Sequence, residues 1–499
     1  MSDLILAIDQ GTTGTTVLAV DSDGRVRGRA YREIRQYYPE PGWVEHDAEE
    51  IARGAATLAK AALKAARATA GDVRAIGITN QRETFVLWDR RSGRPVHRAI
   101  VWQCRRSAEI CERLREREQE VADRTGLLID PYFSGTKVKW IFDRQPALRS
   151  RAERGELCFG TIDTWLAFRL SGGAAFVTDQ TNASRTMMLN LERLDWDDEM
   201  LAMLGVPREM LPTVVPSRGP LAETAPGVMG ARAVPIGAMI GDQQAALFGQ
   251  GAVNPGDAKA TYGTGAFLLM NTGTQRVRSR NRLLTTSALG VDGRPSYALE
   301  GSVFIAGAAI QWLRDGLGLI KKAADSLALA RKSRDRSHPY VVPAFVGLGA
   351  PYWNAAARGA IVGITRGTTR ADIVRAALDS IAYQVSDVFA AMEQDTGRSI
   401  TELRADGGAA TNPYLMQFQA DILGKPVRRP RMVETTALGS AMLAGLATRV
   451  WSGQSELDIF FRRAKVFEPA MGEDERERLL SGWRDAVRKV LHGQAAVAS

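Results

Sequence analysis

Apolar runs separated by short polar turns predict a chain of buried strands and amphipathic helices. Residues 4–8 (LILAI) are continuously apolar, as in a strand buried on both faces. The run ends in a Gly/Thr-rich turn at residues 9–16 (DQGTTGTT), and a second apolar segment then closes in a Ser-Asp-Gly turn. Residues 48–68 and 370–396 carry apolar side chains at helical spacing. We therefore predict an α/β protein.

The opening pattern recurs in the second half of the chain. Residues 260–273 (ATYGTGAFLLMNTG) repeat the layout of residues 7–20 (AIDQGTTGTTVLAV), with an apolar entry, a Gly-Thr turn and an apolar exit. A chain of 499 residues is also too long for a single hydrophobic core. We predict two domains, 1–249 and 250–499, that meet at a cleft near the Gly/Pro/Asn-rich passage 250–257.

Three segments give less regular patterns. Residues 301–313 (GSVFIAGAAIQWL) have the spacing of a helix entered through small residues, with Gly307 and Gln311 four apart on one face. Residues 207–235 are rich in Pro, Gly and Ala, which predicts an irregular excursion. Lys137 lies in an amphipathic segment and is predicted to face solvent.

Two acidic side chains stand where a cleft would need them. Asp242-Gln243 follows a strand-like apolar segment, and ligands bind beyond the carboxyl ends of strands in open α/β sheets. Asp9 lies on the lip of the first Gly/Thr turn, where a carboxylate can meet a hydrated Mg²⁺. That turn is neither GxxxxGK[ST] nor GxGxxG, which excludes P-loop and Rossmann sites. Its backbone and Thr donors can still hold phosphate oxygens. Taken alone, the Gly-Thr-Gly turn at 263–265 is more typical of an ordinary surface turn.

Other polar and aromatic residues suggest a pocket for a molecule with hydroxyl groups. Arg82 and Glu83 stand between apolar segments, where unpaired charges would cost several kcal/mol. They fit contacts to vicinal hydroxyls and a satisfied structural ion pair equally well. Trp102 ends another apolar run and fits either the core or the cover of a substrate's C–H face. Tyr132 can offer a phenolic hydroxyl.

A candidate site for a planar ligand lies near residue 410. Gly407-Gly408 follows a strand-like segment and lets the backbone approach a flat ring closely. The Asn412 side chain can read an adenine edge, because its amide both donates and accepts.

Composition narrows the functional classes. The net charge is +9, but acids and bases alternate along the chain instead of forming the basic blocks of a nucleic-acid binder. Three cysteines with no CxxC spacing argue for a reducing compartment and against a structural zinc site. No apolar run reaches the ~18 to 20 residues that span a bilayer, and no signal peptide is evident. We expect a cytoplasmic enzyme.

Several ordered motifs carry a resemblance to a known family. The segments DQGTT, YFSGTKVKW, GDQQA, YGTG and ADGGAATNPYLMQFQADILGKPV resemble carbohydrate kinases of the FGGY family. Within that family, QRET, VWQCRR, GTIDTWL, TDQTNASRTMMLN and LDWDDEML resemble members that act on glycerol. The likeness covers nearly the whole chain.

The resemblance implies a fold, a reaction and a set of site residues. The fold would be α/β, with two actin-like, ribonuclease-H-like ATPase domains and an active site in the cleft between them. The reaction would be Mg²⁺-dependent phosphoryl transfer from ATP to glycerol in a homo-oligomer, with Asp242 as general base and Asp9 near the metal. The residues that fall at polyol contacts are Arg82, Glu83, Trp102, Tyr132, Asp242, Gln243 and Phe267. Those that fall at ATP or ADP contacts are Thr12, Thr13, Gly14, Thr264, Gly307, Gln311, Gly408 and Asn412.

Two rival functions are weighed against this one. Another kinase of the family could act on a pentulose or a four-carbon polyol, although the aromatic pair Trp102 and Phe267 favours a small substrate. A non-catalytic, actin-like nucleotide-binding or assembly protein would have no reason to keep Asp242 together with the Arg82-Glu83 pair.

Two positions depart from the family pattern. Thr16 stands where many members that act on glycerol carry an arginine that reaches the nucleotide phosphates, so that contact is in doubt. Residues 227–234 (GVMGARAV) lack the Gly-Gly-x-Arg arrangement of members regulated by a sugar bisphosphate, and no histidine lies in this loop. Regulation through this loop is therefore not expected.

Overall fold

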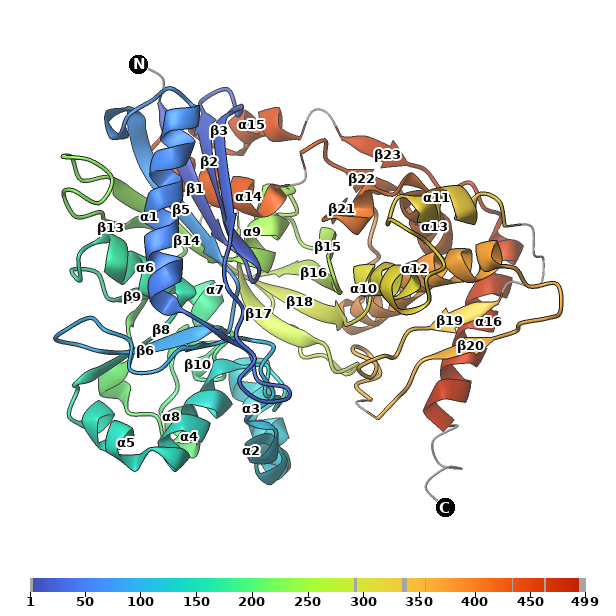
Figure 1. The fold of residues 1–499 in the computed structure, drawn as a ribbon, viewed down its shortest axis with the longest axis horizontal. Coiled ribbons are helices and arrows are strands. Elements are labelled where there is room, and N and C mark those ends of the chain that lie inside the picture. The colour runs from blue at the N-terminus through green and yellow to red at the C-terminus, as the bar shows by residue number, and fades with distance from the viewer. Residues whose placement is uncertain are drawn as a thin grey trace.

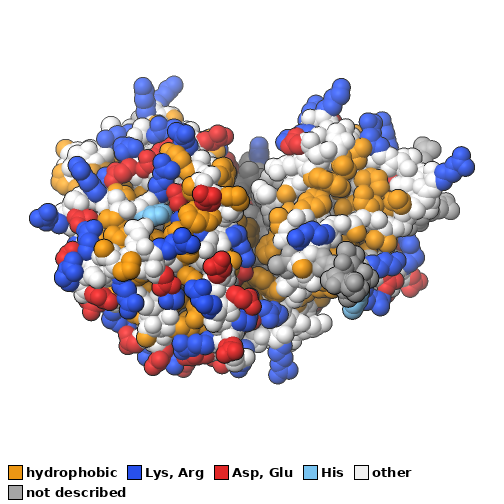
Figure 2. Space-filling view, turned by 60° about the horizontal axis from the view of Figure 1, so that its bottom comes forward, with side chains coloured by type: hydrophobic (Ala, Val, Ile, Leu, Met, Phe, Trp, Pro, Cys, Tyr) orange, Lys and Arg blue, Asp and Glu red, His pale blue; other side chains and the backbone are white. Residues whose placement is uncertain are grey.

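The computed structural model has two lobes (Figure 1), and the space-filling view shows a furrow between them (Figure 2). It describes residues 3–290, 294–333, 339–354, 356–432, 434–461 and 464–492. Each lobe is built around one large sheet, and none of the described helices is long and apolar enough to cross a membrane.

The first lobe contains a six-stranded sheet in the order β13-β14-β5-β1-β2-β3. Its strands are β1 (Leu4–Gln10), β2 (Gly14–Asp21), β3 (Val26–Glu33), β5 (Val73–Asn80), β13 (Arg218–Glu223) and β14 (Pro235–Gly241). The apolar run 4–8 lies in β1, is buried throughout, and pairs antiparallel with β2 and parallel with β5. The helices α1 (Ala48–Ala65) and α6 (Ile162–Leu170) contribute to the apolar core with β1, β2 and β5.

The second lobe contains a seven-stranded sheet in the order β17-β18-β16-β15-β21-β22-β23. Its strands are β15 (Ala258–Tyr262), β16 (Ala266–Gly273), β17 (Leu284–Leu289), β18 (Pro295–Val303), β21 (Leu403–Asp406), β22 (Val427–Arg429) and β23 (Lys465–Phe467). In this sheet β15 runs antiparallel to β16 and parallel to β21, as β1 does to β2 and β5. The repeat inferred from the sequence is therefore confirmed. The long helix α12 (Arg370–Thr396) packs on this sheet.

A smaller four-stranded sheet, β4-β7-β6-β8, also belongs to the first lobe. Its strands are β4 (Glu45–His46), β6 (Phe85–Asp89), β7 (Ala99–Ile100) and β8 (Leu157–Thr161). The helices of this lobe that bear on the site are α4 (Ser134–Arg144), α7 (Gln180–Ala183) and α9 (Asp242–Gly249). Its remaining helices are α2 (Ala108–Arg113), α3 (Glu118–Thr125), α5 (Pro146–Glu153) and α8 (Asp198–Leu204).

One helix crosses between the two halves of the sequence. The helix α14 (Thr435–Ala447) comes late in the chain, yet Ala437, Leu438 and Ala441 pack against Ile5 and Ala7 of β1. Figure 1 shows it, coloured orange-red, among the blue strands of the first lobe. The division at residues 249 and 250 stays a prediction, and α14 packs on the other side of it.

The structure corrects two predictions about segments. Residues 301–303 of the expected helix 301–313 belong to β18, and the helix α10 (Gly307–Gln311) begins only at Gly307. A short run of small and apolar residues is compatible with both a strand and a helix. The spacing of its apolar positions therefore cannot show which of the two it forms. The excursion 207–235 is not wholly irregular, because it contains β12 (Thr213–Val215) and the edge strand β13.

Candidate active site

Asp242 is the first residue of α9 and directly follows β14. Because β14 runs parallel to β5, with Gly241 beside Asn80, the residues after both strands meet at one edge of the sheet. The Asp242 Oδ1 atom accepts a hydrogen bond of 2.7 Å from the Gln243 backbone N–H and lies 3.3 Å from Arg82 Nε. Burial raises the pKa of Asp242, although Arg82 and Lys259 oppose this. The side chain is 26% exposed, so a ligand can reach it.

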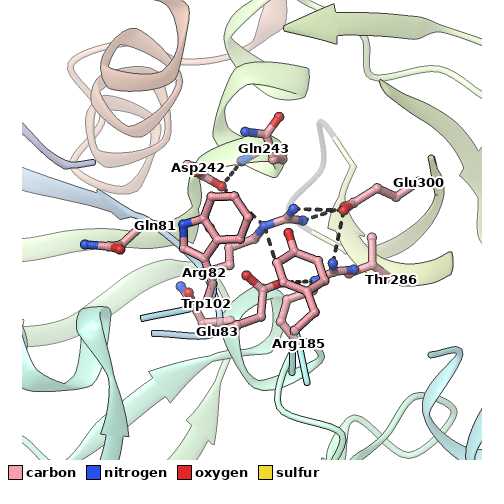
Figure 3. Close-up of polar contacts among 12 residues, drawn as sticks. Gln81, Arg82, Glu83, Trp102, Arg185, Asp242, Gln243, Thr286 and Glu300 are labelled. Atoms are coloured by element: carbon pink, nitrogen blue, oxygen red, sulfur yellow. Dashed lines mark hydrogen bonds and ion pairs between the residues drawn. The ribbon is translucent and has the colours of Figure 1, made fainter. Parts of the chain in front are cut away.

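Arg82 and Glu83 belong to a buried network of charges (Figure 3). They lie 4.0 Å apart, and each has a closer partner of opposite charge. Arg82 donates to both oxygens of Glu300, at 2.6 and 2.9 Å. Glu83 accepts a 2.6 Å hydrogen bond from Arg185, which also donates to Glu300 at 3.0 Å. Both charges are satisfied structurally, and the network ends beside Asp242.

The backbone at Glu83 is held in an uncommon conformation. Its φ of 60° lies in the left-handed region, which costs a non-glycine residue free energy. The Ser134 hydroxyl donates a 2.7 Å hydrogen bond to the Glu83 carbonyl oxygen and helps to fix this turn. Such strained positions concentrate at functional sites.

Three aromatic rings gather near Asp242 and Arg82. Trp102 packs edge-to-face with Tyr132 at 5.4 Å and with Phe267 at 6.0 Å between ring centroids. Phe267 comes from β16 of the second sheet, whereas Trp102 follows β7 and Tyr132 precedes α4, both in the first lobe. The predicted apolar cover is thus assembled from both lobes.

The prediction that Lys137 faces solvent is wrong. Its side chain is fully buried, and its ammonium donates to the carbonyl oxygens of Val101 and Tyr132 at 3.3 and 2.9 Å. Burial lowers the pKa of Lys137 to about 8. The lysine therefore ties together the two segments that carry Trp102 and Tyr132.

Gln243 is also held by a buried lysine. Lys259 donates to Gln243 Oε1 and, at 2.9 Å, to Thr261 Oγ1. Burial lowers the pKa of Lys259 to about 8, although the carboxylates of Asp406 and Asp242 favour its charged form. Lys259 thus places a buried cation close to Asp242.

A second group of predicted residues lines a cavity of about 460 Å³ in the second lobe. Five of the eight predicted nucleotide contacts border it, namely Thr264, Gly307, Gln311, Gly408 and Asn412. The apolar side chains of Ile310, Leu327 and Leu415 complete part of its wall. A mostly apolar pocket with a few polar groups suits a nucleobase and its sugar.

Two residues show why small or capping side chains stand at this cavity. A Cβ atom at Gly307 would lie 2.6 Å from the Gly263 carbonyl oxygen, so only glycine fits against this turn. Asn412 caps α13 (Pro413–Leu423), because its side-chain oxygen accepts from Tyr414 and Leu415 backbone N–H groups. Only its amide Nδ2–H groups, one of which points to Ser326 Oγ at 3.4 Å, remain for a ligand.

Thr12 and Thr13 lie on the turn between β1 and β2, and Gly14 is the first residue of β2; all three lie outside the lining of that cavity. A Cβ atom at Gly14 would lie 2.7 Å from the Arg32 carbonyl oxygen, which demands glycine. Thr12 Oγ1 accepts a 2.8 Å hydrogen bond from the Trp102 indole. The turn therefore borders the aromatic cluster.

The carboxylate of Asp9, at the end of β1, lies where its surroundings disfavour a negative charge. Burial, together with the negative charges of Asp242 and Glu434, raises its pKa to about 7. Within the described ranges no hydrogen-bond donor reaches this carboxylate, and no cluster of three or more His, Cys, Asp or Glu could hold a metal by itself. A cation bound with other oxygen ligands would relieve the repulsion.

Sequence reasoning missed Arg185, Glu300, Lys259 and the role of Lys137. Arg185 and Glu300 are each a single charge in an otherwise apolar or small-residue segment, NASRTMM and YALEGSV. Such a charge needs a buried partner, because isolated ions are costly inside a protein. That signal marks the residues as paired but does not name their partners.

The chain matches known proteins along almost its whole length. Residues 4–249 match the N-terminal domain of the FGGY family of carbohydrate kinases, and residues 258–448 match its C-terminal domain. A protein named glycerol kinase 2 from Thermotoga maritima is 54% identical over 98% of both chains. A glycerol kinase from Carboxydothermus hydrogenoformans is 55% identical over 97% of both.

Solved structures of carbohydrate kinases also match the chain. A glycerol kinase from Plasmodium falciparum, solved with ADP, superposes with a TM-score of 0.92 at 34% identity over 98% of each chain. A xylulose kinase from Lactobacillus acidophilus shares the fold, with a TM-score of 0.85 at 22% identity over 100% of this chain and 99% of its own. These matches confirm the expected fold class of two actin-like, ribonuclease-H-like domains, and the chain belongs to the FGGY family of carbohydrate kinases.

Proposed function

We propose that this chain transfers the γ-phosphoryl group of ATP to a terminal hydroxyl of glycerol, giving sn-glycerol 3-phosphate and ADP. The observation that carries the proposal is the meeting of Asp242, Arg82 and the aromatic rings of both lobes at one edge of the first sheet. Relatives that are 54 to 55% identical over almost the whole chain are named glycerol kinases, which supports the choice of substrate. The expected homo-oligomer and cytoplasmic location remain predictions.

In the proposed reaction Asp242 accepts the proton of the attacking hydroxyl. The α9 N-terminus and Arg82 favour its charged form, and burial keeps it basic. Because phosphoryl transfer passes through a loose transition state, most of the rate comes from alignment and electrostatics. Asp242 therefore acts mainly by orienting the hydroxyl and taking its proton late.

The polyol would lie between charged and aromatic groups. Arg82, Glu83 and Gln243 supply donors and acceptors for the remaining hydroxyls, and Tyr132 adds a phenolic O–H. Trp102 and Phe267, which pack edge-to-face on each other, would cover the carbon chain. Closure of the two lobes would exclude water that otherwise hydrolyses ATP.

The nucleotide would bind across the furrow. Its base and ribose fit the cavity bordered by Gly307, Gln311, Gly408 and Asn412, and the turns at Thr12–Gly14 and Thr264 would donate to phosphate oxygens. Asp9 fits one carboxylate ligand of Mg²⁺, a metal that usually binds through few carboxylates, water and substrate phosphates. When bound, Mg²⁺ would neutralise charge on the phosphates.

An ADP-release assay with glycerol, erythritol, xylulose and no acceptor tests the proposal. We expect glycerol to accelerate ADP release by at least ~10²-fold over the acceptor-free rate, the usual scale for a positioned acceptor and base. A higher kcat/KM with xylulose or erythritol would instead indicate another kinase of the family. No ADP release with or without any acceptor would indicate a non-catalytic protein.

A further inference from the structure

Glu300 is a carboxylate of the second sheet that lies among the arginines of the first lobe (Figure 3). Its side chain is fully buried, and both oxygens are used. Oε2 accepts from Arg82 at 2.6 Å, while Oε1 accepts from Arg82 at 2.9 Å and from Arg185 at 3.0 Å. A two-point contact of this kind fixes the plane of a guanidinium group as well as its position.

The contact with Glu300 determines what Arg82 can do next to the substrate. Its two terminal nitrogens are held by Glu300, which leaves Nε directed at Asp242 Oδ1, 3.3 Å away. A rotated guanidinium would lose this geometry. The orientation of a predicted polyol contact therefore depends on a side chain that is not itself predicted to touch the polyol.

Through Arg185, the Glu300 carboxylate also affects the residues Glu83 and Tyr132. Arg185 is held between Glu83, at 2.6 Å, and Glu300, and it lies over the Tyr132 ring at 5.6 Å. Without Glu300, the two arginines would face each other with one fewer negative charge in a fully buried space. Such groups repel and reorient, since a buried charge that loses its partner is strongly destabilised.

The strand that carries Glu300 is well anchored in the second sheet. β18 pairs with both β16 and β17, and Glu300 lies opposite Leu269 on one side and Leu284 on the other. β16 also supplies Phe267. Glu300 is therefore positioned by the second sheet and acts on residues of the first lobe.

We propose that Glu300 is a positioning residue that makes polyol binding dependent on the docking of the second sheet against the first lobe. This inference rests on the proposed function. Arg82, Glu83 and Tyr132 would form a competent polyol site only while Glu300 holds Arg82 and Arg185. The base and ribose of the nucleotide would bind in a cavity that Glu300 does not line, so ADP affinity would be affected much less.

The test compares Glu300→Gln and Glu300→Asp with the parent in steady-state assays of glycerol and ATP, with ADP binding measured directly. We expect Glu300→Gln to raise the KM for glycerol by at least ~10-fold while the KM for ATP and the ADP affinity change by less than ~3-fold. Glu300→Asp keeps the charge and should recover part of the loss. If Glu300→Gln does not fold, the glycerol-specific KM effect must appear in Glu300→Asp.

Glu402→Gln is the matched control, because Glu402 also pairs with two arginines, Arg404 and Arg428, but lies outside the site. Its KM for glycerol should match that of the parent. Equal KM values for parent and Glu300→Gln, or parallel losses for glycerol and ATP, would overturn the positioning role. A parent protein without glycerol-dependent ADP release would instead refute the proposed function, and the inference with it.

Discussion

The Trp102 indole N–H donates a 2.8 Å hydrogen bond to the Thr12 hydroxyl, which joins the predicted polyol wall to the predicted phosphate turn. Trp102 also packs against Phe267 of the second sheet. One side chain thus contacts both lobes and both proposed substrate regions. The relative placement of acceptor and donor should therefore depend on this indole.

Trp102→Phe tests that dependence, because it keeps an aromatic cover and removes the N–H donor. Loss of one neutral hydrogen bond is worth about 1 kcal/mol, so we expect kcat/KM for glycerol to fall by about 5-fold. Trp43→Phe is the matched control, since the Trp43 ring packs on Trp140 and not on Tyr132 or Phe267. Equal losses in both variants would show that the effect comes from general packing.

Asp242→Asn removes the proposed base while preserving side-chain shape. We expect turnover of glycerol to fall by ~10² or more, because a positioned base contributes at least this factor. ADP affinity and the thermal midpoint should stay close to those of the parent, since the nucleotide cavity does not include Asp242. A variant that phosphorylates glycerol at the parent rate would exclude Asp242 as the base.

The sequence predicts the sheets and part of the site for physical reasons. A continuous apolar run such as 4–8 can only be a buried strand or a buried helix, and the short Gly/Thr turn after it favours the strand. Parallel strands end at the same edge, so residues that follow β5 and β14 had to meet. Arg82 and Asp242 are neighbours for that reason.

The rest of the site depends on tertiary contacts that local patterns do not contain. Glu300 comes from another sheet, 218 positions along the chain from Arg82. An amphipathic pattern assigns polar residues to solvent, and Lys137 breaks that rule because two carbonyl oxygens inside the protein solvate its ammonium. The spacing of apolar residues along the chain predicts neither the contact between Glu300 and Arg82 nor the burial of Lys137.

Lys137→Met should weaken the polyol wall and the fold together. The substitution keeps the length of the side chain but removes this donor from the Tyr132 carbonyl oxygen, whereas the Val101 carbonyl oxygen still accepts from the Cys104 backbone N–H at 3.0 Å. An unsatisfied buried acceptor costs about 1 to 3 kcal/mol, so the urea midpoint should drop and the KM for glycerol should rise. Lys139→Met is the control, because Lys139 pairs with Asp143 near the surface. A larger effect at Lys139 would contradict the prediction.

His46 gives the fold a specific sensitivity to acid. The imidazole is fully buried, accepts from Gln81 Nε2 at 3.3 Å and donates from Nε2 to Gln36 at 2.8 Å. These partners fit the neutral ring, and burial lowers the pKa of His46 from 6.5 to about 4. Gln36 and Gln81 also donate to the Thr12 and Gly11 carbonyl oxygens. His46 and its two glutamine partners therefore help to hold the turn between β1 and β2.

The sign of the pH effect follows from the depressed pKa. Between pH 6.5 and pH 4 the unfolded chain binds a proton that the folded protein does not, so the stability contributed by neutral His46 is complete above pH 6.5 and falls as pH decreases toward 4. Between pH 7.5 and pH 5 this loss of folding stability amounts to about 2 kcal/mol.

Urea unfolding of the parent and of His46→Gln at both pH values isolates the effect, because other titrating groups are common to both proteins. The parent should lose more stability than the variant over this interval, whereas His97→Gln, which changes a half-buried histidine outside this network, should follow the parent. Identical losses in the parent and His46→Gln would show that His46 titrates normally in the folded protein.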